Sequence, residues 1–234
     1  MLLKWIFDRV GALCALFLLW PLLLVVAVLI KVMMPGGPVI FRQQRVGKGG
    51  RLFTCHKFRT MMVKHHGSTV SVAGDARITP LGAKLRRYKI DELPGLWDVL
   101  IGKMSMVGPR PDVPGYADRL EGRDRDVLRL LPGITGPATL KYRMEEEMIS
   151  DCMKRIRRGH FNSMKEIGWR REDCPDFSNM TNHNLAHWLN DHVIYPDKVR
   201  INCYYARNYS FLKDIQIIMA TILGQRIWYN GEWI

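Results

Sequence analysis

The sequence predicts a mostly helical α+β domain that is held to a membrane by one N-terminal helix. The stretch from Val10 to Ile30 has no charged residue and is long enough, at about 1.5 Å per residue, to cross a bilayer core. Two short extended segments follow, and helical spacing of apolar residues prevails in the rest of the chain. Residues 1–35 form the predicted membrane helix, and residues 36–234 form a compact cytosolic domain.

Composition narrows the class of partner. The chain has 234 residues and a net charge of +13, which indicates nucleic acid, an anionic lipid surface or phosphorylated substrates. A nucleic-acid binder has no use for a long apolar helix, so no nucleic-acid partner is expected. The five cysteines are odd in number and scattered, which is typical of a reducing cytosol rather than a disulfide framework.

Pro21 lies near the middle of the uncharged run. We expect a sharp bend beside it at Trp20, because proline removes one helical hydrogen bond. Both flanks of the run are basic: Lys4 and Arg9 precede it, and Lys31, Arg42, Arg45, Lys48 and Arg51 follow it. The positive-inside rule then favours a re-entrant helix with both ends on the cytoplasmic side. A kinked helix that spans the bilayer remains the alternative.

Val39 to Arg45 and Arg51 to Phe58 are predicted strands, joined by a glycine-rich loop. The loop at Gly47 lacks the Gly-Lys-Ser/Thr helix start of a phosphate loop, so we do not interpret it as a nucleotide site of its own. On an alternating strand, Lys57 and Arg59 would share one face. A polar segment from 64 to 76 has no periodicity and is predicted to be a loop beside the site.

Two predicted helices flank an adjacent acid pair. The first begins at Thr79-Pro80, which combines an N-cap with a tolerated proline, and ends near Ile90, with an apolar stripe at Leu81, Leu85 and Tyr88. The second runs from Glu92 to about Leu100, with Asp91 as its N-cap. Spacing alone favours a simple solvated cap. A helix–helix corner would also favour a bound anion, because free N–H groups gather there.

A rigid turn, Gly108-Pro109-Arg110-Pro111, follows and leaves the planar donors of Arg110 free for a phosphate or a base edge. The blocks around the acid pair resemble the signature of bacterial sugar transferases, in the small single-domain form of the monotopic polyprenyl-phosphate phosphoglycosyl transferases. Several blocks in one order are more specific than any single motif, and they cover roughly three quarters of the chain. They are Phe41, Gln44, Arg45, Gly47, Phe53, 57–61, 91–94, Leu96-Trp97, 102–111, 132–136, Arg143 and parts of 199–221.

The resemblance implies a two-step reaction. A UDP-sugar donates its phosphosugar to Asp91, UMP leaves, and polyprenyl (undecaprenyl) phosphate attacks the covalent intermediate, which predicts ping-pong kinetics. Asp91 is then the nucleophile and the ligand of Mg²⁺, while Glu92 assists by positioning or proton handling. Mg²⁺ is expected because it binds through one or two carboxylates plus substrate phosphates. The implied substrate-binding residues are Lys57, Arg59, Arg86, Pro109, Arg110, Pro111 and Arg143.

The resemblance also implies a place in the cell. Members of this family have a re-entrant, proline-broken membrane helix, and the break corresponds here to Trp20-Pro21, where a small polar residue before the proline is more usual. The catalytic domain would face the cytoplasm at the bacterial inner membrane, with membrane lipid and downstream glycosyltransferases as partners. An amphipathic helix after Ser210, together with Trp228, Tyr229 and Trp233, is expected at the lipid interface.

Two segments carry less familiar expectations. Val113 to Leu131 is predicted to be an amphipathic helix with a solvated face. Residues 145–191 depart from the family pattern as an insertion. A zinc site of Cys174, His183 and His187 can be imagined there, but the spacings fit no zinc finger, so a structural cap or partner-binding segment is favoured.

The sequence argues against one further class of function, glycoside hydrolysis, and leaves two alternatives open. Glycoside hydrolysis needs two carboxylates at least ~5 Å apart across a sugar, with one protonated, whereas adjacent acids ringed by Arg86, Arg87 and Lys89 are stabilised as anions. A non-catalytic basic membrane adaptor and a glycosyltransferase that releases UDP stay as alternatives. The sequence indicates neither the sugar nor the glycan pathway (capsule, exopolysaccharide or another glycoconjugate), and it leaves the oligomeric state open.

Overall fold

The computed structural model describes residues 1–63, 76–159, 175 and 177–234. These residues are mostly helical, with short strands and one long apolar N-terminal helix, which confirms the predicted fold class in this form. Residues 64–75 of the predicted loop, and Cys174 of the zinc site considered above, lie outside the described residues. The α-helices are α1 (Leu2–Met33), α2 (Pro80–Arg87), α3 (Gly95–Leu100), α4 (Pro137–Lys141), α5 (Glu145–Arg157), α6 (Asn182–Leu189), α7 (Tyr195–Arg207) and α8 (Phe211–Leu223). The strands are β1 (Ile40–Val46), β2 (Leu52–Phe58), β3 (Ser105–Val107), β4 (Gly133–Thr135), β5 (Trp228–Tyr229) and β6 (Glu232–Trp233).

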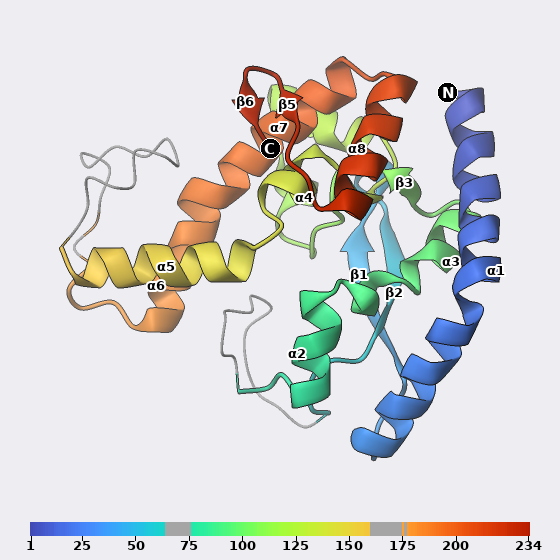
Figure 1. The fold of residues 1–234 in the computed structure, drawn as a ribbon. Coiled ribbons are helices and arrows are strands. Elements are labelled where there is room, and N and C mark those ends of the chain that lie inside the picture. The colour runs from blue at the N-terminus through green and yellow to red at the C-terminus, as the bar shows by residue number, and fades with distance from the viewer. Residues whose placement is uncertain (64–75, 160–174, 176) are drawn as a thin grey trace.

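Helix α1 lies along one side of the molecule, and α5 and α6 lie on the opposite side (Figure 1). Pro21 is inside α1, so the helix is not broken into two pieces; its axis changes direction in the second half instead. Among the described helices, α1 is the one long and apolar enough to cross a membrane, and Phe17 and Trp20 are exposed on it.

The first turns of α1 dock onto the rest of the chain through buried charges. The Lys4 Nζ atom lies 2.6 Å from the Asp214 carboxylate of α8 and also donates to the Val107 carbonyl. The Asp8 carboxylate accepts from the backbone N–H of Met106 at 3.0 Å. Lys4 is 5% exposed, so this basic residue at the flank of the uncharged run is buried against the rest of the chain. Asp214 already neutralises it.

The two predicted strands form the antiparallel hairpin β1–β2, with Ile40 opposite Phe58 and Val46 opposite Leu52. Phe58 packs with Leu85 of α2 against the second half of α1. Farther along the chain, β3 and β4 pair in parallel. At the end of this pair, a Cβ atom on Gly133 would lie 2.1 Å from the backbone nitrogen of Gly108, so only glycine fits there. This close approach fixes where the turn after β3 emerges.

The acid pair lies between α2 and α3, as predicted, but the local geometry differs. Thr79 caps α2 by accepting from the Gly82 N–H at 3.0 Å. Lys89 has a positive φ of 55°, and residues 90–92 form one 3₁₀ turn (Ile90–Glu92), so α3 begins only at Gly95. Asp91 is therefore not the N-cap of the second helix. Tyr88 is 70% exposed, so it does not belong to the buried stripe of α2.

The α-helix predicted from Val113 to Leu131 is wrong. The structure has two 3₁₀ segments there, Ala117–Arg119 and Gly122–Arg129. The glycines at positions 115 and 122 have φ values of 102° and 54°, which an α-helix does not contain. The described part of 145–191 behaves differently, because α5 and α6 bury apolar residues in the largest core cluster together with Tyr205 and Ile217. These residues are Ile149, Ile156, Leu185 and Leu189.

Candidate functional site

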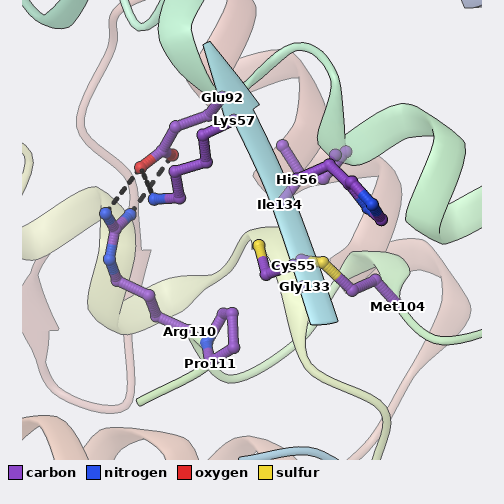
Figure 2. A pocket seen from close by; sticks show the side chains of 10 residues that line it. Cys55, His56, Lys57, Glu92, Met104, Arg110, Pro111, Gly133 and Ile134 are labelled. Atoms are coloured by element: carbon purple, nitrogen blue, oxygen red, sulfur yellow. Dashed lines mark hydrogen bonds and ion pairs between the residues drawn. The ribbon is translucent and has the colours of Figure 1, made fainter. Parts of the chain in front are cut away.

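Three charged side chains from distant parts of the chain meet at one point. Glu92 Oε1 accepts from Lys57 Nζ at 2.9 Å and from Arg110 NH2 at 2.5 Å, and its Oε2 accepts from Arg110 NH1 at 3.3 Å. Figure 2 shows Lys57 and Arg110 converging on Glu92, while His56 points to the other side of the strand. Two cations therefore share one carboxylate at the edge of a small cavity that includes Cys55 and Met104.

This arrangement changes the titration of its members. Burial alone would raise the pKa of Glu92, but Arg110 and Lys57 outweigh it and hold that pKa well below its usual value. Burial lowers the pKa of Lys57, and the negative charge of Glu92 opposes that change. Glu92 raises the pKa of Arg110. Two basic side chains thus share the single carboxylate of Glu92, an arrangement that suits an incoming phosphate.

The backbone positions Arg110 from both sides. The Pro109 carbonyl accepts from the Gly133 N–H at 2.8 Å, and the Pro111 carbonyl accepts from Arg45 NH1 at 3.0 Å. The two prolines restrict the backbone of the turn, and the two hydrogen bonds to Glu92 hold the guanidinium of Arg110. The sequence prediction of a rigid turn around Arg110 is consistent with this geometry, but the predicted free donors are not all free, because NH1 and NH2 both donate to Glu92. The roles of Pro109 and Pro111 in a nucleotide pocket stay predictions.

Asp91 differs from the adjacent Glu92 because one of its carboxylate oxygens has no hydrogen-bond partner among the described residues. Asp91 is 8% exposed, and the unpartnered atom is Oδ1. Burial and then the charge of Glu92 raise the pKa of Asp91, and Lys57, Arg86 and Arg110 oppose the increase. Buried polar atoms are nearly always hydrogen-bonded, so an unpartnered carboxylate oxygen beside three cations indicates a place for a ligand or a reaction.

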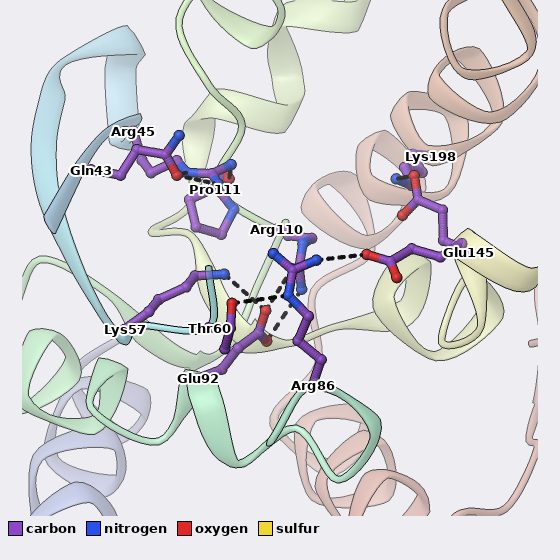
Figure 3. A network of polar contacts seen from close by, with 11 residues as sticks. Gln43, Arg45, Lys57, Thr60, Arg86, Glu92, Arg110, Pro111, Glu145 and Lys198 are labelled. Atoms are coloured by element: carbon purple, nitrogen blue, oxygen red, sulfur yellow. Dashed lines mark hydrogen bonds and ion pairs between the residues drawn. The ribbon is translucent and has the colours of Figure 1, made fainter. Parts of the chain in front are cut away.

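Arg86 belongs to the same polar network, which Figure 3 shows from another side. Its Nε donates to the Thr60 hydroxyl at 3.0 Å, and its NH1 lies 2.9 Å from the Glu146 carboxylate at the start of α5. Arg86 therefore connects the neighbourhood of Asp91 with the first turn of α5. Helix α2 supplies the arginine, and its Thr79 cap fixes the position of that helix.

Two predicted substrate-binding arginines lie elsewhere. Arg59 is 6% exposed and donates to the Met34 carbonyl at the end of α1, because β2 ends at Phe58 and the strand alternation does not extend to it. Arg143 donates to the Thr221 carbonyl of α8 at 2.5 Å. Within the described residues, neither forms a hydrogen bond or ion pair with Asp91 or Glu92. Their substrate roles remain predictions that need movement of these side chains.

The structure adds residues that the sequence analysis did not select. Glu145 pairs with Lys198 of α7 at 2.6 Å, and Glu146 pairs with Arg86. Burial raises the pKa of Asp112 to about 6, against the opposing charges of Lys198 and Arg45. The acidic run at 145–147 was a visible signal, but its partners come from α2 and α7, which a sequence pattern does not connect.

The donor set decides what metal the site suits. Asp91 offers a free carboxylate oxygen, whereas Glu92 is engaged by two cations. Among the described residues, no three His, Cys, Asp or Glu side chains gather as a metal site. His183 and His187 lie next to each other on α6, with ring centroids 4.6 Å apart, but no third such side chain among the described residues joins them. A single free carboxylate oxygen is compatible with Mg²⁺, which binds through one or two carboxylates plus substrate phosphates and water, and the metal stays a prediction.

Comparison with known proteins identifies the family. A family model described as bacterial sugar transferase matches residues 1–159. The chain belongs to this family. The match includes Lys57, Arg86, the acid pair, Arg110 and Arg143, and it ends within the 145–191 segment. The predicted family is thus confirmed, whereas the resumed resemblance at 199–221 lies outside the matched residues.

Individual relatives agree with the family match. The chain is 44% identical over 156 residues to a UDP-glucose:undecaprenyl-phosphate glucose-1-phosphate transferase of Xanthomonas campestris pv. campestris, and the match covers 64% of this chain and 32% of that protein. It is 43% identical over 142 residues to a UDP-N-acetylgalactosamine-undecaprenyl-phosphate N-acetylgalactosaminephosphotransferase of Aeromonas hydrophila, covering 58% and 33%. The match therefore spans about a third of each relative. The exopolysaccharide production protein PSS of Rhizobium leguminosarum bv. phaseoli is 42% identical over 152 residues, covering 60% of this chain and 74% of that protein.

Proposed function

We propose that this sugar transferase moves a phosphosugar from a UDP-sugar to polyprenyl phosphate, through a covalent intermediate on Asp91. The observation that carries the proposal is the buried Asp91 oxygen that lacks a partner beside Lys57, Arg86 and Arg110. A carboxylate that served only as a helix cap would accept hydrogen bonds from backbone N–H groups. The names of the relatives, which pair UDP-sugars with undecaprenyl phosphate, support the substrate classes.

In the first step, an Asp91 oxygen attacks the phosphorus that carries the sugar. A new oxygen–phosphorus bond forms, the diphosphate bridge breaks, and UMP leaves with the electrons of that bond. In the second step, an oxygen of polyprenyl phosphate attacks the same phosphorus and releases the Asp91 carboxylate. Because the first product leaves before the second substrate reacts, the kinetics are ping-pong.

The cations have separate tasks in this scheme. Arg110 and Lys57 are held by Glu92, so their remaining N–H donors are fixed in place for phosphate oxygens and need no reorganisation. Arg86 approaches from the α2 side. Asp91 would hold Mg²⁺ together with the substrate phosphates, and bound Mg²⁺ neutralises charge on the diphosphate oxygens. These positive charges also favour the ionised form of Asp91, which its burial disfavours.

The exposed apolar surface supports a membrane location for the reaction. On α8, Leu212 and Ile222 are 78% and 72% exposed, and Trp228 and Trp233 beside them are 58% and 61% exposed. With α1, they supply apolar and aromatic groups of the kind that rest at a lipid interface. We place the enzyme at the bacterial inner membrane, with α1 re-entrant and the site facing the cytoplasm. There it would start glycoconjugate assembly and pass its product to glycosyltransferases.

The test is to trap the first half-reaction. Purified protein is incubated with Mg²⁺ and a UDP-sugar labelled in the sugar, without polyprenyl phosphate, and the protein is then digested and analysed by mass spectrometry. We expect UMP release of about one equivalent and a phosphosugar on the peptide that contains Asp91. Release of UDP would favour a glycosyltransferase instead. A protein that turns over normally but carries no label would overturn the covalent scheme. If no donor leads to nucleotide release, the remaining hypothesis is the non-catalytic membrane adaptor.

A further inference from the structure

The first turn of α5 faces the site with two of its three glutamates. Glu146 Oε1 lies 2.9 Å from Arg86 NH1, and Glu145 Oε1 lies 2.6 Å from Lys198 Nζ. Figure 3 shows Glu145 and Lys198 beside the network that contains Arg86. Glu145 is also close enough to raise the pKa of Arg110. The third glutamate, Glu147, is exposed and forms no ion pair within the described part of the chain.

Arg86 stands between the reacting carboxylate and this turn. Its charge opposes the rise in the pKa of Asp91, and its NH1 donates to Glu146. In the proposed reaction, the sugar is joined through one oxygen to the phosphorus that Asp91 attacks. If Arg86 also binds this phosphate, the attached sugar is brought to the side of the site where Glu146 lies. The Glu146 side chain is 40% exposed, so a ligand can reach it.

The chemistry of a carboxylate suits such a neighbour. An ionised glutamate only accepts hydrogen bonds, and every free sugar hydroxyl can donate one. Hydrogen bonds to a charged acceptor are about twice as strong as neutral ones. Without a ligand, Glu146 instead neutralises Arg86 and competes with phosphate for it. Glu146 thus strengthens the binding of a sugar nucleotide through the sugar hydroxyls and weakens it by competing for Arg86.

We propose that Glu146 is a specificity-determining residue for the sugar: it gives up Arg86 to the diphosphate and accepts hydrogen bonds from hydroxyl groups of the sugar. The inference rests on the proposed function, since it needs a phosphosugar beside Asp91. In this proposal, the first turn of α5 determines which UDP-sugar is preferred, because all donors share the same nucleotide and differ only in the sugar. Glu145 stays with Lys198 and holds the turn in place.

The experiment compares binding of UDP and of UDP-sugars in the presence of Mg²⁺, for wild-type protein and Glu146→Ala. We expect UDP to bind the variant as tightly as wild type or up to about fivefold more tightly, because a half-exposed ion pair that competes for Arg86 is gone. UDP-glucose, UDP-galactose and UDP-N-acetylgalactosamine are compared, and the best wild-type ligand should bind the variant about tenfold more weakly. Weaker binding of the UDP-sugar without weaker binding of UDP excludes a purely structural role.

Two further variants make the result decisive. Glu147→Ala removes a glutamate from the same helical turn and should change neither affinity by more than about twofold. Glu146→Gln keeps one acceptor oxygen without the charge, so its sugar affinity should lie between those of wild type and Glu146→Ala, and it supplies the test if the alanine variant does not fold.

Equal changes for UDP and UDP-sugar would overturn the inference, because Glu146 would then act only through Arg86. So would wild-type protein that binds UDP and every UDP-sugar equally. Failure of the proposed function has a different signature: wild-type protein binds sugar nucleotides but transfers no phosphosugar to Asp91. In that case the donor-selecting role of Glu146 falls with it.

Discussion

Two buried charge networks in this molecule differ in how completely their atoms are partnered. At the junction of α1 and α8, Lys4 bonds to both Asp214 and the Val107 carbonyl, and Tyr205 donates to the other Asp214 oxygen. The Lys4 and Asp214 side chains are only 6% and 2% exposed. At the acid pair, Glu92 is fully engaged, but the adjacent Asp91 keeps a buried oxygen without a partner.

The difference shows what each network does. A closed network stabilises one arrangement of two helices and offers nothing to a ligand. An open network keeps a costly polar atom buried, which a folded protein tolerates where function needs it. Both networks contain buried acidic and basic side chains, so burial and charge alone do not distinguish an anchor from a reaction centre. What distinguishes them is the unpartnered Asp91 oxygen on a carboxylate beside three cations.

The largest expected effect comes from Asp91→Asn. The amide is a poor nucleophile for phosphorus, so transfer of the phosphosugar should fall by about three orders of magnitude or more. Folding should not suffer, because the substitution removes a buried charge next to Glu92. UMP release and the temperature of unfolding measure the two effects. Equal activity of variant and wild type would remove the open network from the chemistry.

Lys4→Met tests the closed network. It leaves the Asp214 carboxylate buried without its cation, which should cost about 3–5 kcal/mol of unfolding free energy. The double variant Lys4→Met with Asp214→Asn should recover most of that loss, because the amide is neutral and still accepts from Tyr205. Unfolding in detergent micelles measures both. A single variant as stable as wild type would show that this junction does not hold α1 to the domain.

The comparison also explains what the sequence could and could not predict. The hairpin, the Thr79 cap and the turn around Arg110 depend on neighbours in the chain, and they were predictable from local spacing. Lys4 and Asp214 are 210 positions apart, so nothing in a local pattern shows that Lys4 is buried. Counting it as a flanking charge followed the ordinary rule for lysines beside a membrane helix.

The residues of the candidate site also fall into two groups, those found from the sequence and those that only the fold brings together. Lys57, Glu92 and Arg110 were selected through the resemblance, and the structure brings them together. Arg59 was also selected through the resemblance, and strand alternation would have put it on the face of Lys57, but β2 ends one residue before it, at Phe58. Glu146 went unselected because its partner Arg86 lies 60 positions before it on another helix. Local patterns therefore identify which residues carry charge, and the fold decides which of them meet.

Arg110→Lys sharpens the account of the open network. Lysine keeps the charge but cannot hold both Glu92 oxygens in the planar geometry of a guanidinium. We expect kcat/KM to fall by about 10- to 100-fold with little change in stability. The matched control is Arg129→Lys, an exposed arginine that pairs only with Asp126 three positions away. A similar loss in both variants would mean that the loss does not come from the contact between Arg110 and Glu92.

The smallest effect should come from Asp112, which belongs to neither network and faces Arg45, Arg110, Lys198 and Tyr195. Burial raises its pKa from 3.8 to about 6, so the folded protein binds this proton more tightly than the unfolded chain does. The resulting stability is fully present below about pH 4 and is lost as the pH rises through about 6.

Asp112→Asn keeps the shape of the side chain and cannot ionise. Its unfolding free energy should depend less on pH between about 4 and 6, and at pH 7–8 it should exceed that of wild type by about 1–2 kcal/mol. Denaturant unfolding at a series of pH values measures the difference. Parallel curves for the two proteins would mean that Arg45 and Lys198 already compensate the ionised form. Asp112 would then count as a third, closed charge cluster rather than an intermediate case.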